Sequence, residues 1–360
     1  MRIIQLIDSL EAGGAERMAV SYANALAEKI EFSALVVTRK EGPLLNQIEP
    51  KVSYLFLNKK RTIDFKAIYS LRSFAKKNKV TIIHAHSTSF FLAFLVKVTF
   101  PSIQLIWHDH YGARVYESRK SNIVLCVVSL FFSAVFVVNN QLELWAKKKL
   151  FVKNVFFIPN FAISDVHITR ETFLKANHTK RIVCVANLKN PKNHIAILIA
   201  YNDLDLDKLG WSLHFIGKDY ADEYSNFLKE YVRENKLSES VFIYNSCNDI
   251  QHILSQAEIG ILSSTDEGFP VALLEYGLAK LSVVSTNVGY CSTIIKNDFN
   301  GLLFDPLSQK ELQNQLYKMI YDESKRKSFG LHLQQLVVGS YSKKSAIDIL
   351  MERYKSIQYL

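Results

Sequence analysis

Two glutamates flank a Gly-Phe-Pro turn in the second half of the chain. The stretch EGFPVALLE begins at Glu267 and ends at Glu275, and it follows an apolar run over residues 259–262 that is typical of a buried parallel strand. Because Pro270 has a preset φ and no N–H, we expect it to be the first residue of a helix that continues over residues 271–280. The first N–H groups of that helix, including that of Leu273, lack intrahelical partners and form an anion site.

A diphosphate fits this anion site, and the two acids then bind what lies on either side of it. Carboxylates repel phosphates, so we expect Glu267 and Glu275 to accept hydrogen bonds from hydroxyl groups at the two ends of the ligand. Glu275 lies about 7.5 Å beyond Pro270 along a helix axis, within reach of a sugar hydroxyl. The pattern indicates a nucleoside-diphosphate sugar. The alternative is that both acids only stabilise the positive end of a surface helix.

Histidines concentrate at two predicted strand ends. His84 and His86 lie in IIHAHS, and His108 and His110 lie in IWHDHYG. A neutral imidazole at the mouth of a cleft can bind sugar hydroxyls or transfer protons. The spacing differs from HExxH and no cysteine is near, but His-x-His on a strand places both rings on one face, so a metal site and a purely structural role both stay open.

Glycines and lysines near other strand ends suit the same chemistry. Gly13 and Gly14 in DSLEAGGAERMAV let backbone N–H groups approach a phosphate or a sugar, although the spacing is not GxGxxG and a structural turn is the alternative. Lys189 and Lys192 in VANLKNPKNH follow another strand, where an ammonium group stabilises the charge that develops on a diphosphate leaving group. Lysines that are only solvated are the alternative.

Length and charge set the wider frame. A chain of 360 residues predicts two domains. The net charge is +10, and residues 1–160 hold 22 Lys and Arg against 11 Asp and Glu, whereas residues 161–360 hold 22 against 23. The basic first half attracts nucleic acid, acidic lipid headgroups or phosphorylated substrates, or it only aids solubility. Four scattered cysteines and a short N-terminal apolar run favour a cytoplasmic protein with neither a zinc site nor a signal peptide.

Short apolar strands alternate with stretches long enough for helices, which predicts parallel α/β domains. In the first half the predicted strands are RIIQLID, FSALVVT, KVSYLFL, TIIHAHS, IQLIWHD and SAVFVVN, and in the second half RIVCVAN, SLHFIG, SVFIYN, EIGILSS and SVVSTN. The polar stretch after NVFFIPNF marks the domain boundary. Because ligands bind at the carboxyl ends of strands in such sheets, we expect the site in a cleft between the two domains.

One apolar segment has two interpretations. Residues 122–138 are 17 residues without a charge, at the lower limit for crossing a bilayer. The α/β alternation favours a helix followed by a strand, with the helix in contact with a membrane surface or another subunit. The segment over residues 89–100 is similarly apolar.

Together these motifs carry a resemblance that runs nearly from end to end. The chain resembles the retaining GT-B glycosyltransferases of glycosyltransferase family 4, the glycosyl transferases group 1 proteins. The matching motifs are GGAE at 13–16, IIHAHS at 82–87, WHDH at 107–110, IPN at 158–160, NLKNPKN at 187–193 and EGFPVALLE at 267–275, of which the last is the family's E-x7-E motif and the most specific.

The resemblance implies two Rossmann-like, doubly wound parallel-sheet domains facing across a cleft. Residues 1–162 would bind the acceptor and residues 163–343 the nucleotide sugar, with a final helix at about 344–360 packing back on the first domain. Three catalytic residues are implied, namely Glu267 at the donor hexose, Lys192 at the diphosphate and His108 near the anomeric centre. The implied substrate contacts are Gly13, Gly14, Asn187, Lys189, Gly268, Phe269, Pro270, Val271, Leu273 and Glu275, the last on the ribose.

Two departures from the family pattern stand out. Asn187 occupies the position where many members have Arg, which removes one cation, although Lys189 is near enough in sequence to replace it. Tyr276 stands where the family has a small residue, and Lys280 follows in the same stretch. A noncatalytic donor-binding subunit and a nucleotide-sugar epimerase on the same frame are therefore the alternatives to a transferase.

The predicted activity is transfer of a hexose from a nucleoside-diphosphate sugar to an acceptor hydroxyl with retained configuration. The basic, apolar first half favours a lipid-linked or saccharide acceptor in the synthesis of cell-surface polysaccharide or glycolipid. We expect a cytoplasmic protein held peripherally at the anionic inner face of the plasma membrane. No metal or other cofactor is expected, and no nucleic-acid-binding motif is present in the sequence.

Overall fold

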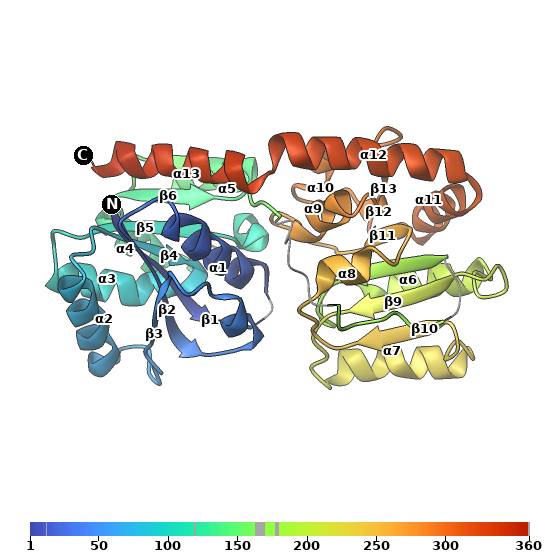
Figure 1. The fold of residues 1–360 in the computed structure, drawn as a ribbon, viewed down its shortest axis with the longest axis horizontal. Helices are drawn as coiled ribbons and strands as arrows, with labels where there is room; N and C mark the ends of the chain where they lie inside the picture. Colours follow the sequence, from blue (N-terminus) through green and yellow to red (C-terminus); the bar gives the residue numbers. More distant parts are fainter. Residues whose placement is uncertain (12, 119, 163–169, 177–179, 359–360) are drawn as a thin grey trace. The chain divides into compact units, whose positions relative to one another are not determined.

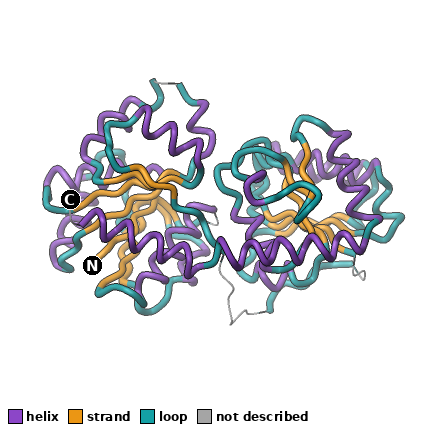
Figure 2. Tube along the Cα trace, turned by 90° about the horizontal axis from the view of Figure 1, so that it is seen from above, coloured by secondary structure: helices purple, strands orange, loops and turns teal. Residues whose placement is uncertain are grey.

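The chain forms two compact units (Figure 1). The computed structural model describes every residue except 12, 119, 163–169, 177–179 and 359–360. Unit 1 comprises residues 1–161 and 343–360, and unit 2 comprises residues 162–342. In each unit helices cover both faces of a parallel sheet, as Figure 2 shows. The predicted α/β class is thus confirmed, and the units divide next to the positions expected from the sequence.

Among its described residues, unit 1 contains a seven-stranded sheet with the order β3-β2-β1-β4-β5-β6-β7. The strands are β1 (Arg2–Ser9), β2 (Phe32–Lys40), β3 (Ser53–Phe56), β4 (Ile82–His86), β5 (Gln104–Asp109), β6 (Ala134–Val137) and β7 (Val155–Phe157). The α-helices are α1 (Gly14–Ala27), α2 (Phe65–Lys77), α3 (Phe90–Thr99), α4 (Ile123–Val128), α5 (Asn140–Lys149) and α13 (Lys343–Gln358). Short 3₁₀ turns are η1 (Pro43–Gln47), η2 (Ser87–Ser89), η3 (Gly112–Tyr116) and η4 (Ser129–Phe131).

The described part of unit 2 contains a six-stranded sheet with the order β10-β9-β8-β11-β12-β13. The strands are β8 (Arg181–Val185), β9 (Ser212–Ile216), β10 (Val241–Tyr244), β11 (Ile259–Leu262), β12 (Ser282–Thr286) and β13 (Leu302–Phe304). The helices are α6 (His194–Asp203), α7 (Glu223–Glu234), α8 (Ile250–Leu254), α9 (Val271–Leu278), α10 (Cys291–Ile294), α11 (Gln309–Tyr321) and α12 (Glu323–Ser340).

Local sequence explains where these elements form. The central strands are apolar runs buried on both faces, as parallel sheets require. Five of the described helices begin at polar residues whose side chains accept a hydrogen bond from the backbone N–H three residues later, each worth about 1 kcal/mol. These caps are Asp64, Asn139, Asp222, Ser308 and Asp322. The sequence did not predict β7 and β13, because three-residue strands at sheet edges are too short to show a periodic pattern.

The final helix belongs to unit 1 although unit 2 separates it from the rest of that unit in sequence. Tyr354 of α13 is fully buried, and its hydroxyl contacts Gln5 of β1 and His84 of β4. At the surface, Lys29, which follows the end of α1, and Asp348 of α13 form an ion pair of 2.8 Å. The helix therefore covers the sheet of unit 1 and completes its core.

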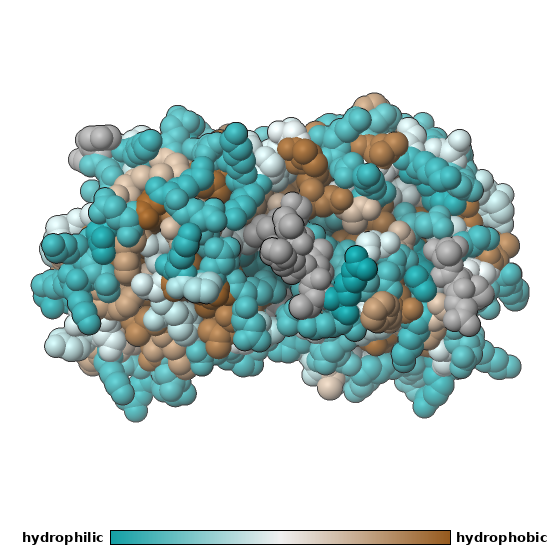
Figure 3. Space-filling model, viewed as in Figure 1, coloured by the Kyte–Doolittle hydropathy of each residue, from teal (hydrophilic) through white to brown (hydrophobic). Residues whose placement is uncertain are grey.

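The apolar segment over residues 122–138 folds as a helix followed by a strand, as the α/β alternation predicted. Its residues form α4, η4 and β6. Within the described residues, no helix combines the length and hydropathy needed to cross a membrane. On the face shown in Figure 3, hydrophobic side chains lie among hydrophilic ones on both units.

Candidate functional site

The strand order of unit 2 marks where a ligand can bind. From β8, the chain adds β9 and β10 on one side of the sheet and β11, β12 and β13 on the other. In open parallel sheets, ligands bind beyond the carboxyl ends of the strands at which this order reverses. Here those strands are β8 and β11, and the loops that follow them carry Lys192 and Glu267.

Lys192 and Glu267 form an ion pair at this position. Lys192 Nζ lies 2.7 Å from Glu267 Oε1, and Ser264 Oγ donates to the same oxygen at 2.6 Å. Neither donor uses Glu267 Oε2. Burial is the largest single influence and lowers the pKa of Lys192, but the charge of Glu267, its hydrogen bond and smaller contributions together raise that pKa above its usual value. Lys192 is therefore a cation at neutral pH.

Hydrogen bonds and a close backbone approach hold three loops together around Glu267. Ser263 Oγ donates to the carbonyl oxygens of Lys192 and Asn193 at 2.9 Å each. Gly289, in the loop after β12, has a φ of +54°, and a Cβ on it would lie 1.6 Å from the carbonyl oxygen of Glu267. Only glycine allows this approach, so the loops after β8, β11 and β12 fix one another.

The start of α9 differs from the prediction in three ways. Pro270 is the N-cap with an extended ψ of 94°, not the first helical residue. The helix ends at Leu278, because Lys280 adopts a φ of +61° that an α-helix does not allow. The N–H of Leu273 donates to the carbonyl of Pro270 at 3.1 Å, so it is not open to an anion. The N–H groups of Val271 and Ala272 remain as the helix-end donors.

Several predicted substrate contacts have side chains in the core. Phe269 packs on Tyr290 and Tyr341, with ring centroids 4.8 and 5.7 Å apart, and Leu273 is fully buried. Pro270 is also buried, whereas Gly268 is half-buried. Phe269, Pro270 and Leu273 therefore shape the turn, and a ligand can meet them only through backbone atoms. Their role as substrate contacts stays a prediction.

Glu275 lies half-buried on α9, beside the unusual Tyr276. The ring of Tyr276 fits because Gly260 has no side chain, since a Cβ there would lie 2.5 Å from the ring. Its hydroxyl accepts the N–H of Val185 at 2.8 Å and donates to the carbonyl of Ile261 at 3.2 Å. Burial raises the pKa of Tyr276 well above its usual value, and the charges of Glu275 and Glu267 add smaller increases. Both predicted acids thus lie within electrostatic range of one hydroxyl.

Asn187 and Lys189 lie in the loop after β8 but differ in exposure. Asn187 Oδ1 accepts the backbone N–H of Lys218 at 2.9 Å, so this position ties two loops together. Lys189 is exposed, and its Nζ lies 5.8 Å from the ring centroid of Tyr220. Of the two predicted lysines, Lys192 is therefore the one paired with Glu267.

In unit 1, Gly13 and Gly14 begin α1 after the strand β1. Gly13 is the N-cap, and a Cβ on it would lie 2.2 Å from a carboxylate oxygen of Glu16. Ser9 Oγ donates to the other oxygen of Glu16 at 3.3 Å. The missing side chain of Gly13 thus makes room for Glu16, whereas Gly14 faces open space. A role of either glycine in phosphate binding stays a prediction.

His84, His86 and His108 are buried rather than open at a strand end, because their face of the sheet is covered by Tyr22 of α1 and Tyr354 of α13. Burial lowers the pKa of all three well below the usual value. A ligand nitrogen from each lies within 4.8 Å of the others, as a metal site requires. Their nitrogens are hydrogen-bonded, except for His108 Nε2, so a metal ion would have to displace these bonds. The catalytic role of His108 stays a prediction.

Comparisons with known proteins identify the family. The family model "Glycosyltransferase Family 4" matches residues 12–162, and "Glycosyl transferases group 1" matches residues 165–332. The chain belongs to glycosyltransferase family 4. This glycosyltransferase is 22% identical to the UDP-Gal:alpha-D-GlcNAc-diphosphoundecaprenol alpha-1,3-galactosyltransferase of Escherichia coli, over 98% of this chain and 95% of that one.

Two further comparisons cover nearly the whole transferase. It is 24% identical, over 91% of each chain, to the GalNAc-alpha-(1->4)-GalNAc-alpha-(1->3)-diNAcBac-PP-undecaprenol alpha-1,4-N-acetyl-D-galactosaminyltransferase of Campylobacter jejuni. Among solved structures, Anabaena HepE in complex with UDP and glucose matches with a TM-score of 0.83 at 16% identity, covering 99% of this chain and 100% of that one. The predicted GT-B fold is confirmed.

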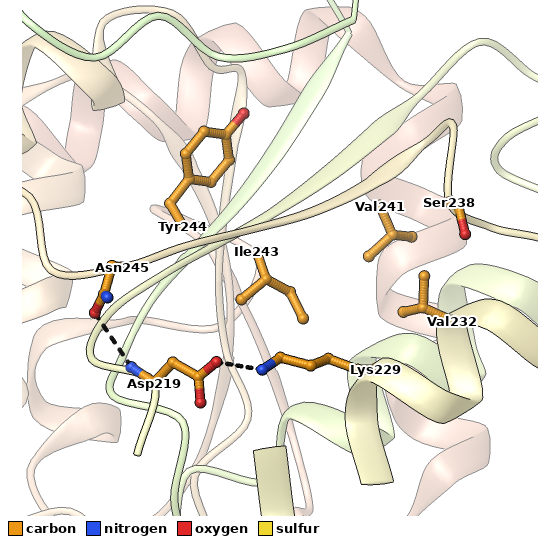
Figure 4. A pocket seen from close by; sticks show the side chains of 8 residues that line it. All are labelled: Asp219, Lys229, Val232, Ser238, Val241, Ile243, Tyr244 and Asn245. Atoms are coloured by element: carbon orange, nitrogen blue, oxygen red, sulfur yellow. Dashed lines mark hydrogen bonds and ion pairs between the residues drawn. The ribbon is translucent and has the colours of Figure 1, made fainter. Parts of the chain in front are cut away.

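A separate hollow in unit 2 of the transferase lies beside the edge strand β10 (Figure 4). Its volume is about 400 Å³. Asp219 and Lys229 line it and neutralise one another at 2.5 Å. It lies at the edge strand β10, which β9 separates from β8 and the loop of Lys192, so we assign it no part in catalysis.

Sequence reasoning missed residues that support the predicted ones. The sequence pattern predicts Ser263 and Ser264 only as the end of a strand, yet they follow β11 and hold Lys192 and Glu267 in place. Paired serines directly after a buried strand were the available signal. Gly289 and Tyr354 gave no signal, because their importance depends on contacts with distant parts of the transferase sequence.

Proposed function

We propose that this glycosyltransferase moves a hexose from a nucleoside-diphosphate sugar to an acceptor hydroxyl with retention of configuration. The observation that carries the proposal is the Lys192–Glu267 ion pair just ahead of α9, at the strand reversal of unit 2. The Lys192 ammonium and the helix-end amides suit a diphosphate. Glu267 Oε2 suits a hexose hydroxyl, and Glu275 suits the ribose.

The chemistry needs charge stabilisation more than a nucleophile. The bond from the anomeric carbon to the diphosphate oxygen breaks, and a bond to the acceptor oxygen forms on the same face. The acceptor proton passes to the departing phosphate oxygen. Lys192 stabilises the negative charge on that leaving group, and a contact of this kind contributes about 3–4 kcal/mol to lowering the barrier. His108 is proposed near the anomeric carbon. The scheme requires no metal.

We further propose a lipid-linked acceptor in cell-surface polysaccharide or glycolipid synthesis, reached from the cytoplasmic face of the membrane. Two relatives that match nearly end to end are named for diphosphoundecaprenol or PP-undecaprenol acceptors, which supports this class. The basic balance of residues 1–160 also suits a phosphate-linked acceptor and an anionic surface.

An exposed apolar patch on unit 1 supports contact with the membrane. The patch consists of Val98, Ile123, Val124, Val127, Leu130 and Phe131, each between 41% and 63% exposed. Phe94 of α3 and Phe131 of η4 pack with ring centroids 4.9 Å apart, which joins the two parts of the patch. Ser129 of η4 accepts the N–H of Phe151, so the lysines at the end of α5 lie nearby. Apolar side chains beside lysines are typical of a surface that binds anionic lipid.

Replacing the ion pair tests the proposed function. The donor is first found by thermal stabilisation with UDP-, GDP-, ADP- and dTDP-sugars, since a ligand that prefers the native state raises its melting temperature. We expect Lys192→Ala and Glu267→Gln each to lower kcat for transfer of the labelled sugar by about 10²–10³-fold. The matched control, Lys229→Ala, breaks the Asp219 ion pair in the same unit and should keep normal turnover.

Near-normal turnover in both site variants would refute the assignment of the site. A wild-type protein that binds donor but never transfers sugar to any lipid-linked or saccharide acceptor would refute the function itself. The scalar coupling constant between H1 and H2 of the transferred sugar, measured by NMR on the product, decides between retention and inversion.

A further inference from the structure

A hydrogen-bonded network of four histidines, one glutamine and one tyrosine runs through the core of unit 1. It ends at two ring nitrogens that have no hydrogen-bond partner among the described residues. Its members are Gln5, His84, His86, His108, His110 and Tyr354. Paired positions on neighbouring strands bring them to one face of the sheet, because Gln5 lies opposite His84 and His86 lies opposite His108. All are fully buried except His110, which is half-buried.

The side-chain amide of Gln5 sets the direction of the network. Its Nε2 donates to the hydroxyl of Tyr354 at 3.2 Å, and its Oε1 lies 2.8 Å from His86 Nε2. An amide nitrogen can only donate and an amide oxygen can only accept. His86 therefore carries its proton on Nε2. The hydroxyl of Tyr354, which accepts from Gln5, uses its own proton toward His84 Nδ1 at 2.6 Å.

Each neutral imidazole has one donor nitrogen and one acceptor nitrogen. The donor-to-acceptor direction of one hydrogen bond therefore fixes the direction of the next bond along both branches of the network. In the first branch, His84 accepts on Nδ1 and donates from Nε2 to His108 Nδ1 at 3.2 Å. His108 must then carry its proton on Nε2. In the second branch, His86 Nδ1 accepts from His110 Nε2 at 2.9 Å. His110 is left with a lone pair on Nδ1.

The two ends of the network are the atoms without partners. His108 Nε2 and His110 Nδ1 are both buried and make no hydrogen bond within the described residues. The two rings are neighbours, with centroids 4.1 Å apart. One end offers an N–H and the other a lone pair, which is the combination that a hydroxyl group needs in order to accept one hydrogen bond and donate another.

We propose that Tyr354 is a positioning residue that holds His108 in the Nε2–H tautomer, so that His108 and His110 together receive a hydroxyl group of a bound sugar. The inference rests on the proposed function for the identity of that ligand. The tautomer assignment itself rests only on the hydrogen bonds of unit 1. Through Tyr354, α13 thus determines which nitrogen of His108, near the end of β5, carries the proton.

Selective removal of one hydroxyl group tests the proposal. Tyr354→Phe keeps the ring and deletes the donor to His84, which removes the bias between the two directions of the His84–His108 bond. The matched control is Tyr22→Phe, because Tyr22 packs on the same imidazoles but its buried hydroxyl makes no hydrogen bond with any described residue. Both variants are checked for folding by melting temperature and near-UV circular dichroism.

The first readout is the tautomer of each histidine, from long-range ¹H–¹⁵N correlation spectra of the full chain. We expect all four network histidines to carry the proton on Nε2 in the wild type and in Tyr22→Phe. In Tyr354→Phe, His84 and His108 should populate the Nδ1–H form, whereas His86 and His110 keep theirs because Gln5 still fixes them. Loss of a signal in His108→Gln assigns His108.

The second readout is kinetic. We expect Tyr354→Phe to lower kcat about tenfold with little change in KM for the donor, and Tyr22→Phe to leave both unchanged. A wild-type His108 protonated on Nδ1, or a His108 tautomer unaffected by Tyr354→Phe, would overturn the proposal. If the wild type transfers no sugar, the proposed function fails, while the spectra still decide whether Tyr354 sets the tautomer.

Discussion

At the scale of single residues, the charged side chains of the proposed site are held in place by neighbours that take no part in the proposed reaction. Glu267 is held on one side by Ser264 and on the other by the close approach of Gly289 to its carbonyl oxygen. Lys192 is held through the two carbonyl bonds of Ser263. The ion pair is therefore placed by the backbone of three loops before any ligand arrives, as electrostatic catalysis requires.

Gly289→Ala should damage the site from outside it. A Cβ at this position, with φ of +54°, would collide with the carbonyl of Glu267 and displace its loop. We expect a free energy of unfolding lower by about 1–3 kcal/mol and a kcat/KM for transfer at least about tenfold lower. Gly339→Ala is the control, because a Cβ there meets nothing within 4 Å. Equal activity and equal stability of the two variants would contradict the proposed coupling of the loops.

At the scale of elements, α4 and η4 are unusual because they leave large apolar side chains in solvent. Ile123 and Leu130 are 62% and 63% exposed, although Leu125 and Val128 of α4 are buried in the core. Burying such side chains in a lipid surface would gain about 1 kcal/mol or more for each. A lipid surface that covers the patch, as proposed, would account for the apolar composition of this run.

Charged substitutions in the patch should weaken binding to anionic vesicles. We expect Val127→Asp/Leu130→Asp to bind at least tenfold more weakly than the wild type in flotation assays at low salt, and binding of the wild type to fall as salt increases. Leu307→Asp changes an equally apolar and more exposed residue of unit 2 and should bind normally. Wild-type protein that stays with the soluble fraction at low salt would remove the membrane proposal and leave the transferase proposal intact.

At the scale of the whole molecule, both units bury neutral histidines. Burial lowers the pKa of His110 and His214 to about 3 and of His194 to about 4, and it holds those of His84, His86 and His108 well below the usual value. The unfolded chain binds protons at these residues below about pH 6.5, whereas the folded chain does not. Stability is therefore full above that pH and falls as the pH decreases from about 6.5 toward the folded values.

The free energy of unfolding should decrease with falling pH more steeply than the protonation of a single histidine can explain. Lowering the pH from 6.5 to 5.5 should cost about 1 kcal/mol of unfolding free energy for each buried neutral histidine, or several kcal/mol in total. Urea unfolding at these two pH values, followed by circular dichroism, measures the change. Equal urea midpoints at pH 6.5 and 5.5 would show that these imidazoles are not buried in neutral form.

How much the sequence could predict depended on how far apart the interacting residues lie in the chain. The alternation of strands and helices predicted both sheets. The motifs after β8 and β11 indicated Lys192 and Glu267 as members of one site, because neighbouring strand ends share one edge of a sheet. The bond between His84 and Tyr354 spans 270 residues and left no local trace. The predicted start and end of α9 were also wrong, since the backbone conformations of Pro270 and Lys280 depend on tertiary packing rather than on local propensity.

Residues 343–360 complete a unit whose strands were synthesised first. During translation, Gln5 and His84 therefore stay without Tyr354 until residues 343–360 have been synthesised, while residues 162–342 can already close their own core. The amino-terminal half of the polypeptide should thus be the last to reach its native state. A premature stop that removes only this tail would leave a carboxyl-proximal domain intact and an amino-proximal one exposed to proteases.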